Sequence, residues 1–120
     1  MAKILIVDDV ETDRVLLAKV VRGAGHDAIQ AADGATALKH AKEHQPALIF
    51  LDVVMPEFNG FDACRKLKQD PSTKAIPVVL VTSKNTDSDK FWGKKQGADE
   101  HIPKPFTAEQ VISAIQRFVP

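Results

Sequence analysis

Five polar residues each follow an apolar run, and together their side chains could perform metal-dependent phosphoryl chemistry. Asp8 and Asp9 follow ILIV, Asp52 follows ALIFL, Thr82 ends PVVLVT, and Lys104 follows DEHIP. Two carboxylates about 4 Å apart repel by roughly 4 kcal/mol at an effective dielectric constant near 20. That repulsion is comparable with the whole stability of a small domain. If the acids converge, a cation, a proton or the lysine must compensate their charge.

The acids favour a Mg²⁺ site with an aspartyl nucleophile. An all-oxygen ligand set suits a hard cation, and Mg²⁺ uses one or two carboxylates while keeping waters and room for a phosphate oxygen. Asp8 and Asp9 would hold the metal, partly through water, together with Asp52. A carboxylate can also attack phosphorus. Lys104 and Thr82 would then bind phosphoryl oxygens through charge and a hydroxyl group.

Each of these residues also has a simpler interpretation. The acid pair could cap a helix, because Asp accepts hydrogen bonds from free backbone N–H groups at a helix N-terminus. Asp52 could be a loop acid, Thr82 a strand-end residue and Lys104 a solvated lysine. The occurrence of all of them together favours the metal and phosphoryl site.

The elements that position these residues alternate between strands and helices. Apolar runs at 4–7, 47–51 and 77–81 are typical of strands buried on both faces, and weaker runs lie near 27–31 and 99–102. Helical spacing follows the first two strands and recurs later in the chain. The residues that carry this spacing are Leu16, Leu17, Val20 and Val21, then Ala35, Leu38 and Ala41, then Phe61, Cys64 and Leu67.

Two further helices complete the pattern. The last, TAEQVISAIQRFV, opens with Thr107 and Gln110 in capping-box spacing and puts Val111, Ile112, Ile115 and Phe118 on one side. The fourth helix contains Phe91, expected in the core, and Trp92, either core or partly exposed. Gly93 beside them indicates close packing or local weakness.

Alternating strands and helices predict a doubly wound α/β domain with a five-stranded parallel sheet and helices on both faces. Ligands of such sheets bind outside the carboxyl ends of the strands, where the five polar residues fall. Met55-Pro56 and Asn59-Gly60 are expected to shape the loop after the third strand.

Composition excludes several classes of protein. The 120 residues include 16 basic and 16 acidic side chains, so no net field favours nucleic acid or an anionic membrane. Cys64 is the single cysteine and cannot form an internal disulfide. The apolar runs are far shorter than the roughly 20 residues of a membrane span, and no signal peptide opens the chain. We therefore expect a cytoplasmic protein without nucleic-acid or membrane partners.

The fragments LIVDD, LDVVMPEFNGFD, VTS and KPF, in this order, resemble the receiver domains of two-component response regulators, which are similar to the chemotaxis protein CheY and share a flavodoxin-like fold. The resemblance implies phosphoryl transfer from a histidine kinase to Asp52, slow autodephosphorylation, and a cis Lys104-Pro105 bond. It implies Mg²⁺ bound by Asp9, Asp52 and the carbonyl of Val54, with Asp8 acting through a metal-bound water. The segment DKFWGKKQGADEHIPKPF resembles the PilH-type regulators of type IV pilus systems and twitching motility.

The same resemblance implies a switch and an output surface. Thr82 would move toward the phosphoryl group, and His101 occupies the position where many receivers carry an aromatic switch residue. A histidine there could make the switch depend on pH. A face formed by helix 4, strand 5 and helix 5 would bind a target protein. Val54 and Lys84 would flank the approach of water to the phosphoryl group.

Three rival functions conflict with the sequence. A phosphatase of the haloacid dehalogenase type needs a second Asp two residues after the nucleophile, where this chain has Val54. A flavodoxin would carry a Ser/Thr-rich phosphate loop after the first strand, where Asp8 and Asp9 stand. A pseudo-receiver would lack an acid or the lysine. We therefore expect residues 1–120 to form a single receiver domain without an output domain, which signals through protein contacts.

Overall fold

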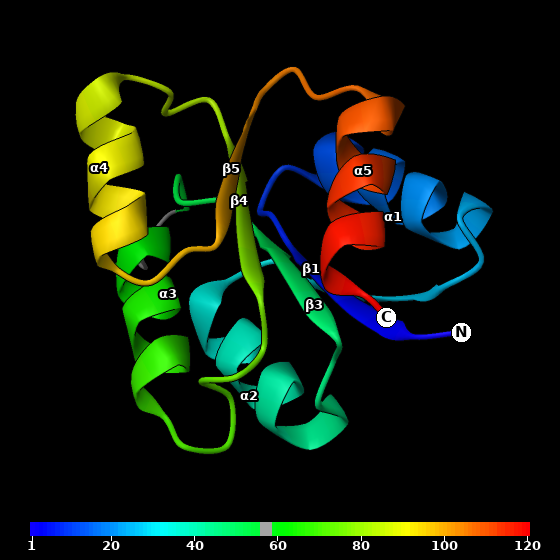
Figure 1. Cartoon of the computed structure of the whole chain (residues 1–120), viewed down its shortest axis with the longest axis horizontal. Helices are drawn as coiled ribbons and strands as arrows, with labels where there is room; N and C mark the ends of the chain where they lie inside the picture. The colour runs from blue at the N-terminus through cyan, green and yellow to red at the C-terminus, as the bar shows by residue number, and fades with distance from the viewer. Residues whose placement is uncertain (56–58) are drawn as a thin grey trace.

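The computed structural model describes residues 1–55 and 59–120, in which strands and helices alternate (Figure 1). The chain runs through β1 (Lys3–Val7), α1 (Glu11–Gly23), β2 (Asp27–Ala31), α2 (Gly34–His44), β3 (Leu48–Leu51), α3 (Gly60–Gln69), β4 (Val78–Thr82), α4 (Asp87–Lys95), β5 (Glu100–Pro103) and α5 (Ala108–Phe118). The strands form one five-stranded sheet in the order β2-β1-β3-β4-β5, and every neighbouring pair is parallel. The predicted doubly wound α/β fold is confirmed.

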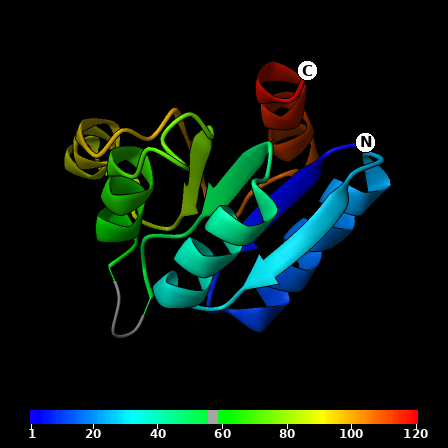
Figure 2. The ribbon, with the colours of Figure 1, turned by 90° about the horizontal axis from the view of Figure 1, so that it is seen from below.

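Alternate residues of the central strands face two hydrophobic layers, because side chains of a strand point in turn to opposite faces. On one face, Leu5, Ile49 and Leu80 pack with residues of α2 and α3. On the other, Ile6, Phe50 and Val81 pack with α1 and α5. Figure 1 shows α1 and α5 together on one side of the sheet, and Figure 2 shows α2 on the opposite side of the strands from α1.

The helix α4 departs from the sequence expectation. Phe91 is 61% exposed, so the prediction that it lies in the core is wrong, and Trp92 is 52% exposed. The buried residue of α4 is Gly93, whose Cα faces the Leu80 side chain so closely that an added Cβ would lie 2.6 Å from Leu80 Cδ1. Successive residues of a helix are about 100° apart around its axis. Phe91 and Gly93 are two residues apart and therefore differ by about 200°, which places Phe91 on the opposite side of α4.

A smaller difference occurs in α1, which buries Leu17, Ala18 and Val21 but leaves Leu16 51% exposed. The expected capping box of α5 is present, because Thr107 Oγ1 accepts from Gln110 N and Gln110 Oε1 accepts from Thr107 N. The Lys104-Pro105 peptide bond is cis, as expected. Among the described residues, no helix is both long and apolar enough to cross a membrane.

The loop after β3 leads into α3 through a capped start. Asn59 is the N-cap, and its Oδ1 accepts from Phe61 N at 2.8 Å. Gly60 N donates to Val53 O at 3.1 Å. Pro56, to which the sequence assigned a role in this loop, lies outside the described residues.

Candidate functional site

The carboxyl ends of three neighbouring strands bring two acids and a threonine together. Val7 of β1 pairs with Leu51 of β3, so Asp8 and Asp52 are the next residues along two adjacent parallel strands. The backbone continues this pairing, since Asp52 N donates to Val7 O at 2.9 Å. Thr82 ends β4, the strand on the other side of β3. The polar residues therefore meet at the crevice that parallel sheets use for ligands.

Three carboxylates form a compact cluster at this edge. Asp8, Asp9 and Asp52 each offer an oxygen, and these oxygens lie within 4.8 Å of one another. Asp8 and Asp52 are buried, while Asp9 is half-buried. One oxygen of Asp9, Oδ1, is buried without a hydrogen-bond partner among the described residues. A buried carboxylate oxygen without a donor is costly unless a cation or water satisfies it.

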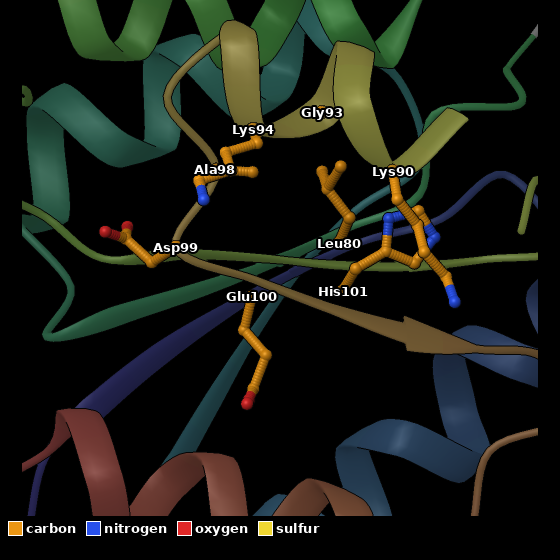
Figure 3. Close-up of a pocket in the computed structure, with 8 residues that line it drawn as sticks. All are labelled: Leu80, Lys90, Gly93, Lys94, Ala98, Asp99, Glu100 and His101. Atoms are coloured by element: carbon orange, nitrogen blue, oxygen red, sulfur yellow. The ribbon is translucent and has the colours of Figure 1, made fainter. Parts of the chain in front are cut away.

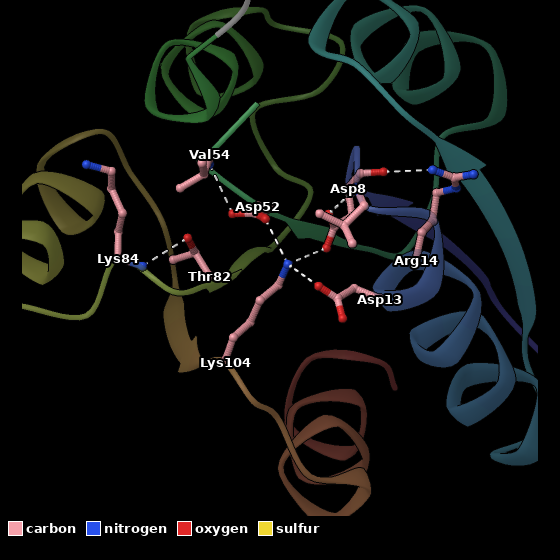
Figure 4. Close-up of polar contacts among 9 residues, drawn as sticks. Asp8, Asp13, Arg14, Asp52, Val54, Thr82, Lys84 and Lys104 are labelled. Atoms are coloured by element: carbon pink, nitrogen blue, oxygen red, sulfur yellow. Dashed lines mark hydrogen bonds and ion pairs between the residues drawn. The ribbon is translucent and has the colours of Figure 1, made fainter. Parts of the chain in front are cut away.

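Lys104 supplies a positive charge within the cluster (Figure 4). Its Nζ donates to Asp8 Oδ2 at 2.7 Å and to Asp52 Oδ2 at 2.9 Å. A third bond, also 2.9 Å long, reaches Asp13 Oδ2 in the first turn of α1. The lysine thus lies between carboxylates from β1, β3 and α1, although it follows the edge strand β5.

The electrostatics of the site follow from burial and these bonds. Burial raises the pKa of Asp8, and the bonds from Lys104 and from the backbone N–H of Val10 offset only part of this effect. For Lys104, burial disfavours the ammonium, but hydrogen bonds to Asp8, Asp13 and Asp52 outweigh it and raise its pKa above the ordinary value. The lysine therefore stays protonated and counters the acids.

Backbone donors orient the carboxylates. Asp52 Oδ1 accepts from Val54 N at 3.0 Å, and Asp8 Oδ1 accepts from Val10 N at 2.9 Å. The N-cap of α1 is Val10, which makes no side-chain cap bond. Asp8 accepts from the N–H of the N-cap residue, but neither Asp8 nor Asp9 occupies the N-cap position, so helix capping alone does not account for the acid pair.

The remaining residues expected at the site surround Asp52. Thr82 is buried, and its Oγ1 accepts from Lys84 N at 3.2 Å. Val54 is 44% exposed beside the acids. Figure 4 shows Thr82 and Lys84 on the opposite side of Asp52 from Asp8.

His101 lies in β5, away from the acids. Its Nε2 lies 3.0 Å from Asn85 Oδ1, within hydrogen-bond distance. Its Nδ1 is buried and has no partner among the residues described. Burial lowers the pKa of His101, and the charge of Lys90 lowers it further, while Asp89 and a bond to the Lys84 backbone oppose these effects. The neutral ring is therefore favoured near pH 7.

Sequence reasoning missed two residues of this site, Asp13 and Arg14, and assigned Gly60 only to the geometry of the loop after the third strand. Arg14 Nη1 donates to the backbone oxygen of Asp8 at 3.0 Å and fixes the end of β1. A Cβ on Gly60 would overlap Val53 Cα and the Asp52 carbonyl oxygen, so only glycine allows α3 to begin so close to the acid. A signal for Asp13 existed, because the first turn after a strand with functional acids lies at the same edge of the sheet.

Comparison with known proteins defines the class. The response regulator receiver domain family matches residues 4–116. The chain belongs to this family, whose general function is Mg²⁺-dependent phosphorylation of an aspartate in signalling with histidine kinases and downstream targets.

Particular relatives cover nearly the whole chain. Protein PilH of Pseudomonas aeruginosa is 41% identical over 115 residues, which are 96% of this chain and 95% of that protein. The chemotaxis protein CheY4 of Vibrio cholerae is 32% identical, with a TM-score of 0.93 and 99% of each chain covered. The receiver domain of the Pseudomonas aeruginosa sensor histidine kinase PA1611, solved with magnesium in its active-site cleft, shares the fold at 22% identity and a TM-score of 0.90, covering 98% of this chain and 96% of that one. The predicted membership of the CheY-like receivers and the likeness to PilH are confirmed.

Proposed function

We propose that Asp52 is the phosphoacceptor of this receiver domain. One observation carries the proposal: Asp52, Asp8 and Asp9 converge within 4.8 Å, while Lys104 donates to Asp52 at 2.9 Å. Asp52 attacks the phosphorus of a phosphohistidine, the new O–P bond replaces the P–N bond, and the leaving imidazole takes up a proton. An uncharged amino group would stabilise the negative charge of the transferring phosphoryl group poorly. The raised pKa of Lys104 keeps this side chain cationic.

Mg²⁺ is the cofactor that the site fits. The buried, unpartnered Oδ1 of Asp9 and the all-oxygen donor set support this ion. Asp9, Asp52 and the carbonyl of Val54 would bind it directly, and Asp8 would act through a water. When bound, Mg²⁺ neutralises charge on the phosphoryl oxygens.

Lys104 and Thr82 would bind the phosphoryl oxygens once Asp52 is modified. Lys104 already contacts Asp52 Oδ2, so a group attached there would meet its ammonium. Thr82 Oγ1 accepts from Lys84 N, which leaves its hydroxyl hydrogen free to donate to the phosphoryl group. Movement of Thr82 toward that group would draw the loop after β4 with it and change the surroundings of His101, whose partner Asn85 lies in that loop. Slow autodephosphorylation would follow by water attack past Val54 and Lys84.

The output surface we propose is the face of α4, β5 and α5. A cavity of about 360 Å³ lies between α4 and β5 (Figure 3). His101 and Gly93 line it, together with Leu80, Lys90, Lys94, Ala98, Asp99 and Glu100. Trp92, which packs edge to face with Phe91, instead lines a separate hollow with Phe61 and Arg65 of α3. The cavity, with Lys90 and Lys94 at its wall, suits a downstream target protein with acidic groups. We propose no nucleic-acid or membrane partner.

The pathway is proposed from the likeness to PilH-type regulators: type IV pilus and twitching motility, or chemotaxis control. The cytoplasmic location belongs to the same proposal. Transfer of phosphate from a purified chemosensory kinase or phosphotransfer domain, compared with an unrelated kinase, tests the pathway.

Incubation with acetyl phosphate and Mg²⁺, followed by intact mass measurement, tests the chemistry. We expect one base-labile phosphoryl adduct on the parent protein and none on Asp52→Asn. No adduct on the parent, as in a pseudo-receiver, or equal adducts on both proteins would overturn the assignment of Asp52.

A further inference from the structure

A second group of metal-ligating side chains lies on α2, away from the acids. His40, Glu43 and His44 each offer one ligand atom, and these atoms lie within 4.8 Å of one another. His40 and His44 are separated by one helical turn, with ring centroids 5.4 Å apart. A histidine pair at this spacing can chelate one ion without any change in the backbone.

The donor atoms indicate the kind of metal. Imidazole nitrogens suit Zn²⁺, Ni²⁺ and Cu²⁺, whereas Mg²⁺ prefers oxygen. Tetrahedral Zn²⁺ with bonds of about 2.1 Å places its ligands roughly 3.4 Å apart. The three ligand atoms therefore need to move only slightly closer to one another. Rotation of the side chains of exposed Glu43 and the half-exposed histidines permits this.

The histidines are also available for a ligand. Nδ1 of His40 is buried and has no hydrogen-bond partner within the described part of the chain. Glu43 meets Lys39 at 4.0 Å, with both side chains at least half exposed, and such a pair is weak. Lys42 on the same turn pairs instead with Asp70 at 3.1 Å. Among the described residues, the weak Lys39 contact is the one ion pair that competes with a metal for Glu43.

We propose that His40, Glu43 and His44 form a binding site for a borderline transition-metal ion such as Zn²⁺, with the remaining coordination completed by water. The site is separate from the acidic cluster. His44 ends α2 and lies before β3 begins at Leu48, whereas Asp52 follows the other end of the same strand. The ion would bridge the last turn of α2 and stabilise it against fraying.

Calorimetric titration with Zn²⁺ in excess Mg²⁺ tests this site while the acidic cluster is saturated. Loss of a residue that merely orients a ligand already lowers metal affinity about tenfold or more, so His40→Ala and His44→Ala are expected to lose at least that much. Glu43→Gln should also weaken binding, and Lys39→Gln should strengthen it. Circular dichroism checks that each variant keeps its fold.

Two controls make the result specific. His26→Ala and Glu11→Gln alter a histidine and an exposed acid elsewhere and should bind Zn²⁺ like the parent protein. In two-dimensional NMR of the imidazole rings, Zn²⁺ should shift His40 and His44 but leave His26 and His101 in place. Unchanged affinity in His40→Ala, or zinc binding lost only in Asp52→Asn, would overturn the proposal; neither result bears on phosphorylation of Asp52.

Discussion

Lys104 holds the acidic cluster together at the level of single residues. It donates to three carboxylates, and the side chains of Lys104, Asp8 and Asp52 are largely shielded from water. Removal of one member of such a group leaves the others with uncompensated charge, which costs more than the group itself contributes.

Lys104→Met is therefore expected to lower the free energy of unfolding by about 1–3 kcal/mol without Mg²⁺. Added Mg²⁺ should recover part of the loss, because the ion supplies the missing positive charge. Urea unfolding with and without Mg²⁺ measures both effects, and Lys94→Met, an exposed lysine of α4, is the control. A loss of the same size in both conditions would contradict the role of Lys104 as a counter-charge.

The lowered pKa of His101 leads us to expect that the stability of the domain depends on pH. Burial, with the charge of Lys90, lowers its pKa below the ordinary value near 6.5. Between that value and the lower folded pKa, the unfolded chain binds more protons than the folded one, so the free energy of unfolding falls as the pH decreases. His101→Gln should show a smaller loss between about pH 7.5 and about pH 5.5.

Urea unfolding of both proteins across this range measures the difference. At about pH 8 the His101 ring is neutral in both the folded and the unfolded parent protein, so a difference in stability between the two proteins at that pH reports packing alone and is subtracted. Equal acid losses in the parent protein and in His101→Gln would show that another group titrates. The sequence-based expectation of a pH-dependent switch at His101 stays a prediction, which binding of a target at two pH values would address.

At the level of elements, α3 must start close to the phosphoacceptor. Gly60→Ala would drive a methyl group into the backbone of Asp52 and Val53, which cannot yield as a flexible side chain would. We expect a loss of about 1–3 kcal/mol in the free energy of unfolding. Because the Val54 carbonyl would move with this backbone, Mg²⁺ affinity should also fall.

Denaturation and Mg²⁺ titration test Gly60→Ala, and Gly23→Ala is a matched control because a Cβ there meets no atom within 4 Å. If Gly60→Ala weakened stability but left Mg²⁺ affinity intact, the helix start would matter for folding alone.

The elements also show what the sequence could and could not predict. Strands buried on both faces leave continuous apolar runs, and the capping box of α5 is a local pattern, so both were predictable. The face of α4 was predicted only in part: Gly93 was expected to mark close packing or local weakness and does pack against Leu80, but Phe91, a large apolar residue, was wrongly placed in the core. Asp13 was missed although its place in the first turn after β1 was a signal, because the sequence alone does not show which side of α1 faces Lys104.

At the level of the whole molecule, the charged side chains lie at the carboxyl ends of the strands, while helices cover both faces of the sheet. The acids of β1 and β3 cannot move apart without breaking the pairing of Val7 with Leu51. The folded state therefore keeps these carboxylates close together despite their repulsion. Any cation that binds there must stabilise the entire folded domain by mass action.

Asp9→Asn distinguishes the repulsion among the acids from the stabilisation that a bound cation provides. Without Mg²⁺ it should raise the free energy of unfolding by about 1 kcal/mol, because it removes one of three clustered charges. With Mg²⁺ the order should reverse, since the parent protein gains stability from the ion while the variant has lost a ligand. Thermal unfolding over a Mg²⁺ series measures the crossing, and Glu11→Gln, which removes an exposed acid of α1, should follow the parent protein. Parallel curves for the parent protein and Asp9→Asn would mean that Mg²⁺ does not bind through Asp9, and the buried oxygen of that residue would then need another partner.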